Sequence, residues 1–383
     1  MFFNRAFRSF FLAGTLFASL SMFIWWLSYQ NAGYSFATVS PMYWHAHEMV
    51  FGYALATVTG FLLTAVMNWT GLNSASGKWL IALFIVWLAA RIGYLIDLDI
   101  IYVALLDISF TLGLFLHFAT PIIKTKQWKQ LGLAAKFLLL VLANSAFYAG
   151  ALDVFEQGEY YGVIAGLFLV LAINLTMMRR LIPFFTEKAF GLPEKLNTKW
   201  IDISAIIGFL ALMLALLIDQ AWLISLIAFP LALIHAFRWW YWYHPKIWSV
   251  VLIWPLYVSY GFMILGMLLF GLVGLKMLNE SIAIHALAAG GIGLLCSAMM
   301  ARISLGHTNR NVFEAPKAVL AVFVILTLTA VVRVILPLID NRHYTLWMEI
   351  SQWGWILAFM LLSLIYWPIL TKPSPMKGLG IRL

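Results

Sequence analysis

Twelve apolar stretches, most of them about as long as a bilayer is thick, limit what this chain can fold into. A helix needs about 20 apolar residues to cross the hydrocarbon core, and inside lipid only helices and closed barrels satisfy every backbone polar group. Barrel strands would alternate over short segments, whereas these runs are continuous. The chain is therefore predicted to be an all-α polytopic membrane protein, a single integral membrane domain over residues 1–383. Its spans are expected at 10–29, 43–67, 78–97, 99–122, 130–152, 160–185, 200–218, 221–240, 247–275, 279–303, 316–338 and 345–370.

The composition and the distribution of charge identify the lipid bilayer as the chain's environment. Hydrophobic residues make up 64% of the sequence and charged residues only 10%, which excludes a soluble globule. The net charge of +9 comes without a dense Lys/Arg run, so no nucleic-acid partner is expected. Of the 24 lysines and arginines, only Arg91, Lys276, Arg333 and Arg342 fall on the side opposite the N-terminus. This bias predicts that both termini are cytoplasmic.

The sequence Trp44-His45-Ala46-His47-Glu48 opens the second span and is its most informative part. Ionisable groups within a membrane span are costly and suggest a ligand, proton or metal pathway. Neutral imidazole is also the commonest protein ligand for metals, so His45 and His47 are candidate ligands, and Glu48 is a candidate for proton transfer or for orienting a ligand. The alternative is an interfacial pair of histidines beside Tyr43 and Trp44.

The geometry of a helix restricts how His45 and His47 can act together. Two residues apart on a regular helix, their side chains point about 200° away from each other. A shared metal therefore requires an irregular entry turn, for which Pro41 offers a reason. Otherwise one imidazole faces the helix bundle and the other serves a neighbouring site.

The tenth span carries two further candidates, His285 near its start and His307 just after its end. They are 22 residues apart, roughly 33 Å along a continuous helix, so one metal cannot bind both. The stretch between them is rich in Ala and Gly, which suits close helix packing or the approach of a flat cofactor. The histidines therefore predict two sites, or one site and structural histidines.

Arg180 and Arg302 are candidates for binding an anionic group such as a haem propionate through paired hydrogen bonds. The alternative for Arg180, and the favoured one for Arg179, is a charge that only marks the cytoplasmic end of a helix.

Several familiar motifs are absent from the sequence. It has no Gly-rich phosphate loop and only one cysteine, Cys296, which excludes a Cys-x-x-Cys motif, covalently attached haem and an intramolecular disulfide. No internal repeat is evident in so biased a composition.

The segments WHAHEMVFGY, GFLLTAVMNWTG and IHALAAGGIGLLCSAMMARISLGHTNR resemble the NnrS family of bacterial membrane proteins. The family's WHAHE motif falls on residues 44–48, its NWTG on 68–71, its tenth-span histidine on His285 and its SLGHTGR-like end on 304–310. The sequence departs from the family at Met67, often Pro, and at Asn309, expected to be Gly. Tyr148 and Tyr257 stand where many members carry histidine, which puts a full haem–copper ligand set in doubt.

This resemblance implies haem b, leaves copper open as a second metal, and associates the chain with nitric oxide response and denitrification in a bacterial inner membrane. The expected haem ligands are His45, His47, His285 and His307. The expected partners are nitric oxide or a related diatomic gas and an electron donor such as quinol. The expected activity is binding or reduction of nitric oxide. Two alternatives stay open: a quinol-linked electron-transfer protein with bis-histidine haems, and a metal-handling transporter. A transporter would show interrupted helices at matching places in two halves, and none is evident in the sequence.

Overall fold

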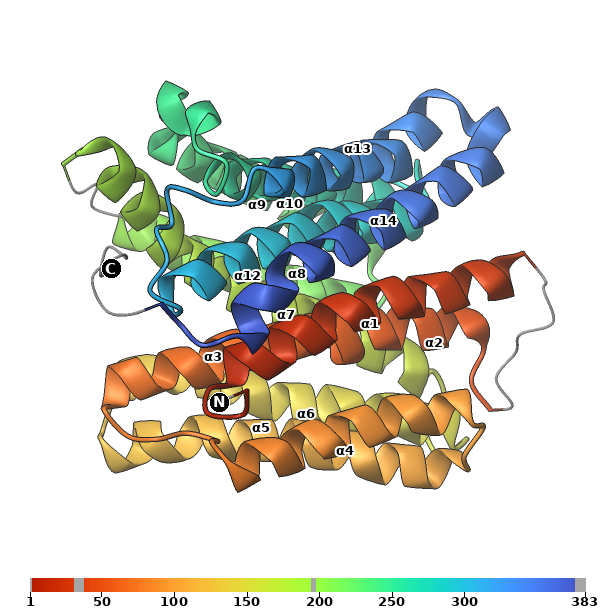
Figure 1. The fold of residues 1–383 in the computed structure, drawn as a ribbon. Coiled ribbons are helices and arrows are strands. Elements are labelled where there is room, and N and C mark those ends of the chain that lie inside the picture. Colours follow the sequence, from red (N-terminus) through yellow and green to blue (C-terminus); the bar gives the residue numbers. More distant parts are fainter. Residues whose placement is uncertain (1, 31–37, 194–197, 376–383) are drawn as a thin grey trace. The chain divides into compact units, whose positions relative to one another are not determined.

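A computed structural model describes residues 2–30, 38–193 and 198–375. Within these ranges it is helical, and twelve helices are long and apolar enough to cross a membrane, which confirms the predicted all-α multi-pass architecture (Figure 1). Three of the cationic residues used to predict the orientation, Lys195, Lys377 and Arg382, lie outside the described residues.

The chain divides into two compact units. Among the described residues, the first unit lies within 1–170, 306–310 and 363–379, and the second within 171–305 and 311–362. The prediction of one membrane domain stays a prediction.

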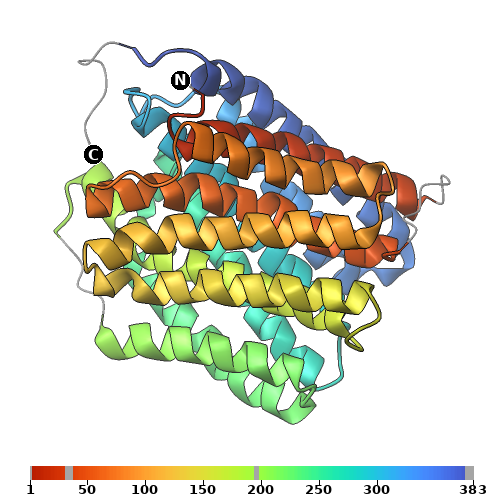
Figure 2. The ribbon, with the colours of Figure 1, turned by 90° about the horizontal axis from the view of Figure 1, so that it is seen from below.

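The first unit contains the first five spans and the beginning of the sixth. Its helices are α1 (Ala6–Tyr29), α2 (Pro41–His47), α3 (Leu55–Thr70), α4 (Lys78–Leu95), α5 (Ile100–Lys124) and α6 (Leu131–Ala151), with a short 3-10 helix, η2 (Trp128–Gln130), before α6. α5 packs against both α4 and α6, and α1 packs along α3. The orange and yellow helices of Figure 2 show α4, α5 and α6 side by side.

The second unit contains the later spans. α7 (Gly158–Phe190) passes into it from the first unit, and it continues with α8 (Lys199–Leu217), α9 (Ala221–Trp242), α10 (Trp254–Gly274), α11 (Glu280–His285), α12 (Leu294–Gly306), α13 (Ala318–Ile339) and α14 (Tyr344–Thr371). Short 3-10 helices, η3 (Pro245–Ser249) and η5 (Asn341–His343), precede α10 and α14. α10 packs against α9 and against the tenth span.

Two spans are interrupted by π-helix. The second span changes from α2 to a π segment, η1 (Glu48–Ala54), directly after His47. The tenth changes from α11 to a π segment, η4 (Ala286–Gly293), directly after His285. Because π segments inside α-helices are rare and concentrate at functional sites, the structure draws attention to the same two histidines as the sequence. It also supplies the helix interruptions that are not evident in the sequence.

Candidate functional site

His47 lies at the centre of a buried polar network in the first unit. Its side chain has no exposed surface and stacks against the rings of Phe51 and Phe147, with centroids 4.9 and 4.2 Å away. Nδ1 lies 2.9 Å from Glu48 Oε1, and Nε2 lies 2.9 Å from Asn144 Oδ1. Asp107 Oδ2 is 3.4 Å from the same Nε2. Both ring nitrogens are therefore engaged by side chains of the protein.

Arg91 joins the two carboxylates of this network. Its Nε lies 2.9 Å from Glu48 Oε2 and its NH2 lies 2.6 Å from Asp107 Oδ1. The three side chains are between 0 and 2% exposed. The contacts are ion pairs by distance, although the N–H directions do not meet hydrogen-bond geometry. Since a buried charge is costly unless it is paired, one guanidinium serving two carboxylates makes this network depend on all three residues.

Asn144 and two tyrosines complete the polar contacts. The Asn144 amide donates to Asp107 Oδ2 (3.0 Å), and the Tyr148 hydroxyl donates to the same oxygen (3.2 Å). The Tyr94 hydroxyl donates in turn to Tyr148 (3.1 Å). Tyr148, which stands where the family resemblance implies a histidine, thus acts here as a hydrogen-bond donor to a carboxylate.

Local structure explains how the second span presents these groups. The Ser40 hydroxyl accepts a hydrogen bond from the N–H of Tyr43 and Pro41 occupies the first turn, so the chain begins a regular helix. His45 and His47 both lie in this helix, and their rings point to different surroundings, as expected from the helical angle. His45 is half-buried and stacks on Trp25, with centroids 4.7 Å apart and ring planes 13° apart.

His285 has a different environment in the second unit. It is half-buried, and its Nδ1 lies 2.7 Å from the carbonyl oxygen of Ser281, one turn earlier. Arg333 of α13 places its NH2 3.0 Å from Nδ1 and 3.1 Å from Nε2, and it donates to Ser281 Oγ at 3.2 Å. These contacts place a carbonyl, a hydroxyl and a cation around the imidazole of His285.

The glycines that follow His285 are explained by helix packing. A Cβ on Gly290 would lie 2.3 Å from the ring of Phe262, and one on Gly293 would lie 2.6 Å from the ring of Trp355. Both distances are shorter than real carbon contacts, so these glycines let α10 and α14 approach the π segment.

His307 belongs to the first unit and lies half-buried beside Phe7, with ring centroids 5.5 Å apart. Burial, assisted by the positive charge of Arg5, lowers the pKa of His307 to about 4. Its imidazole is therefore neutral at pH 7, which is the form that binds metals.

Arg302 is the unusual charge of the second unit. It is 1% exposed, and its guanidinium carbon lies 3.9 Å from the centre of the Phe185 ring. None of its three side-chain nitrogens has a hydrogen-bond partner among the described residues. Arg180 is half-buried on α7, and its neighbour Arg179 pairs with Asp202 at 2.9 Å.

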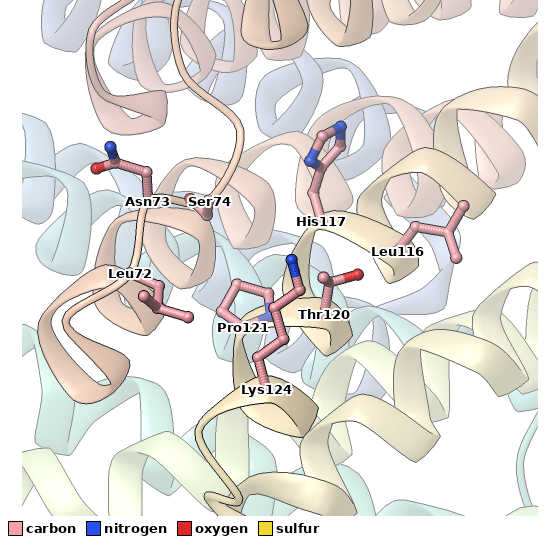
Figure 3. Close-up of a pocket in the computed structure, with 8 residues that line it drawn as sticks. All are labelled: Leu72, Asn73, Ser74, Leu116, His117, Thr120, Pro121 and Lys124. Atoms are coloured by element: carbon pink, nitrogen blue, oxygen red, sulfur yellow. The ribbon is translucent and has the colours of Figure 1, made fainter.

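The described residues contain no group of three or more His, Cys, Asp or Glu side chains arranged to hold a metal ion. They do include an open cavity of about 440 Å³ in the first unit (Figure 3). His117, Thr120 and Lys124 reach it from α5, and Asn73 and Ser74 come from the loop after α3. None of the predicted ligands lines this cavity, which therefore stands apart from the histidine sites.

The residues that sequence reasoning missed are Arg91, Asp107 and Asn144. The sequence presents Arg91 only as a charge on the side opposite the N-terminus, although this residue lies within an apolar span. Asp107 and Asn144 also interrupt apolar spans, and this is the signal that marks functional or paired groups in membranes.

A comparison with curated proteins gives no match. A comparison with protein families matches residues 1–374 to the family described as NnrS protein. This match covers nearly the whole sequence and agrees with the motifs of the second and tenth spans. The chain belongs to the NnrS family.

Proposed function

We propose that this protein binds haem b in the bacterial inner membrane, with both termini cytoplasmic, and acts by binding or reducing nitric oxide at a histidine-ligated haem. Membership of the NnrS family supports a role in the response to nitric oxide. The observation that carries the haem proposal is the geometry of His285. Copper and a quinol donor remain predictions from the resemblance.

His285 fits a haem ligand in the tautomer in which Nδ1 donates to the Ser281 carbonyl, 2.7 Å away. In that tautomer the lone pair is on Nε2. Histidines that bind metals commonly use the same arrangement, with the other ring nitrogen donating to a backbone carbonyl. A metal on Nε2 would replace the contact with Arg333 NH2.

His47 does not fit a haem ligand in this arrangement. Both of its ring nitrogens contact buried side chains, and the rings of Phe51 and Phe147 stack on it. Binding a metal would require breaking the contact with Glu48 or the contacts with Asn144 and Asp107. We therefore assign His47 and Glu48 to the buried network, and the predicted catalytic role of Glu48 stays untested.

Arg302 fits an anionic group. A buried guanidinium that has no hydrogen-bond partner and rests on an aromatic ring is incompletely compensated. A carboxylate would supply two acceptors in the geometry that guanidinium prefers. Arg302 lies 17 residues after His285, roughly 25 Å along the span, so a propionate bound there would belong to a haem at another site. His45 and His307 remain candidates for a second site, and His307 is available as a neutral imidazole.

When bound, a haem iron with one open position supplies the site for a diatomic gas. The chain's own contribution is to orient the ligand. Ser281 fixes the ring of His285, and the packed glycines of η4 hold the turn that follows.

A metal-handling transporter remains the second candidate, and one observation favours it. Interrupted helices occur in the spans that carry His47 and His285, one in each unit, as expected for binding sites in transporters. Uptake of copper into vesicles, abolished in a His285→Ala variant, would support this function instead.

The haem proposal is tested by the haem content of protein purified in detergent. We expect His285→Ala to lose haem, and His117→Ala, which alters another half-buried histidine, to retain it. Equal haem content in both variants, or none in the unaltered protein, would refute the assignment.

A further inference from the structure

The cavity of Figure 3 lies at the end of the first unit where the chain begins. The loop that forms one of its walls, residues 71–77, ends at Gly77, whose N–H donates to the Phe3 carbonyl (2.9 Å). In the orientation proposed above, this is the cytoplasmic end of the unit. The cavity volume of about 440 Å³ falls within the range of about 300–1,000 Å³ that is usual for small-molecule sites. It is therefore large enough to hold a ligand.

The last turns of α5 form one wall of the cavity. His117, Thr120 and Lys124 are three and four residues apart, so they lie on one face of the helix. In Figure 3 the Lys124 side chain extends along α5 toward Thr120. The His117 ring lies 6.1 Å from the ring of Trp79, measured between centroids. This wall thus presents an ammonium group and a hydroxyl group to the same space.

The loop after α3 forms the opposite wall, and hydrogen bonds hold it in place. The Ser74 hydroxyl donates to the Leu63 carbonyl (2.6 Å). The Gln127 amide donates to the Trp69 carbonyl (3.3 Å), which ties the end of α5 to the end of α3. Asn73 lies in this loop and lines the cavity. Its amide is a third polar group at the opening, opposite the side chains of α5.

The charge around the cavity is positive. Residues 49–96 and 108–152 contain no Asp or Glu, and the described residues that line the cavity include none either. The same segments carry four lysines at this end of the unit: Lys78, Lys124, Lys126 and Lys129. A role in membrane topology accounts for the lysines, but not for a cavity in which one of them lies beside a hydroxyl and an amide. Such a cavity favours an anion with several oxygen acceptors.

The rim of the cavity is apolar. Leu72 and Leu116 line it and are 39% and 51% exposed. A small inorganic anion would leave these leucines uncovered, whereas a phospholipid would cover them with its glycerol and acyl chains. Basic pockets at the cytoplasmic side of membrane helices are known to bind anionic headgroups. The combination of cation, hydrogen-bond donors and apolar rim therefore fits a lipid better than a free ion.

We propose that this cavity binds the phosphate group of an anionic phospholipid. Lys124 pairs with the phosphate, the Thr120 hydroxyl and the Asn73 amide donate to its oxygens, and the two leucines contact the apolar part of the lipid. The site goes beyond the proposed function and does not require haem.

The test is thermal unfolding of the full chain in micelles of a neutral detergent, titrated with phosphatidylglycerol. A ligand that binds only the folded state raises the unfolding temperature as its concentration rises. We expect phosphatidylglycerol to raise it more than phosphatidylcholine does at the same mole fraction. Equal shifts with the two lipids would overturn the proposal. An equal shift with sodium phosphate, compared with sodium chloride at the same ionic strength, would also overturn it and identify a free phosphate as the ligand.

Two variants locate the binding, and both alter exposed side chains, so the folded state should be kept. Lys124→Gln should raise the phosphatidylglycerol concentration needed for a half-maximal shift by about tenfold or more, as expected for a hydrogen bond to a charged group. Lys129→Gln, which removes an exposed charge outside the cavity, should change it by about fivefold at most.

The second variant, Thr120→Val, removes a hydroxyl without changing the charge, and it should also raise the phosphatidylglycerol concentration needed. Ser109→Ala, which removes an exposed hydroxyl from the other half of α5, should not. An unchanged response in Thr120→Val would overturn the site. So would equal weakening in Lys124→Gln and Lys129→Gln, because surface charge alone would then account for the binding.

Discussion

Replacing Arg91 with methionine tests whether the buried network holds the first unit together. Methionine preserves much of the length of the side chain and removes the guanidinium, which lies 2.9 Å from Glu48 and 2.6 Å from Asp107. The two carboxylates, 1% and 0% exposed, would then be left without their cation. Neither can gain water without opening the helix packing.

The magnitude follows from burial. Removing one partner of a buried ion pair costs about 3–5 kcal/mol, and here one cation serves two anions, which favours the upper part of that range. Since each 1.4 kcal/mol is about a factor of ten, the folding equilibrium should weaken by about 10²- to 10⁴-fold. Arg91→Lys should fall between, because an ammonium lacks the planar fork that reaches both carboxylates.

The assay is the free energy of unfolding in mixed micelles, measured by titration with denaturing detergent. Arg342→Met is the matched control, since this arginine is 87% exposed and pairs with Asp340 at 3.2 Å. Exposed pairs contribute about 0–1 kcal/mol, so the control should differ little from the unaltered protein. Combining Arg91→Met with Asp107→Leu should cost less than the sum of the two single changes. An Arg91→Met variant as stable as Arg342→Met would refute the reasoning.

Three further predictions use the same unfolding measurements. The pKa of His307 is lowered to about 4, so between pH 6.5 and 4 the unfolded chain binds more protons than the folded one. The free energy of unfolding should therefore fall as the pH drops through this window. It should fall less steeply in the His307→Asn variant. Arg302→Met should leave the unfolding free energy of ligand-free protein unchanged or raise it, since it removes a buried charge that has no hydrogen-bond partner among the described residues. A decrease in the unfolding free energy as large as that of Arg91→Met would contradict this prediction. Gly290→Ala should destabilise by about 1–3 kcal/mol because its Cβ would meet Phe262 at 2.3 Å; Gly261→Ala, with nothing within 4 Å, should not.

The architecture was predictable because the bilayer leaves few choices. Continuous apolar runs of sufficient length have to be helices, and the twelve predicted spans agree with the twelve found among the described residues. The sequence also marks His47 and His285 as candidates, since ionisable groups at the start of an apolar span are costly, and a π segment directly follows each of them.

The partners of these histidines were not predictable from spacing alone. Arg91, Asp107 and Asn144 come from three different helices, and only the packing of α4, α5 and α6 brings them to His47. The π segments depend on local hydrogen bonding that composition does not reveal.

The most direct test of the proposed function is the absorption spectrum of the purified, reduced protein before and after addition of nitric oxide. We predict a haem Soret band that shifts on addition of the gas in the unaltered protein, and loss of that band in His285→Ala but not in His117→Ala. A colourless protein, or a haem whose spectrum ignores nitric oxide and does not depend on His285, would contradict the account.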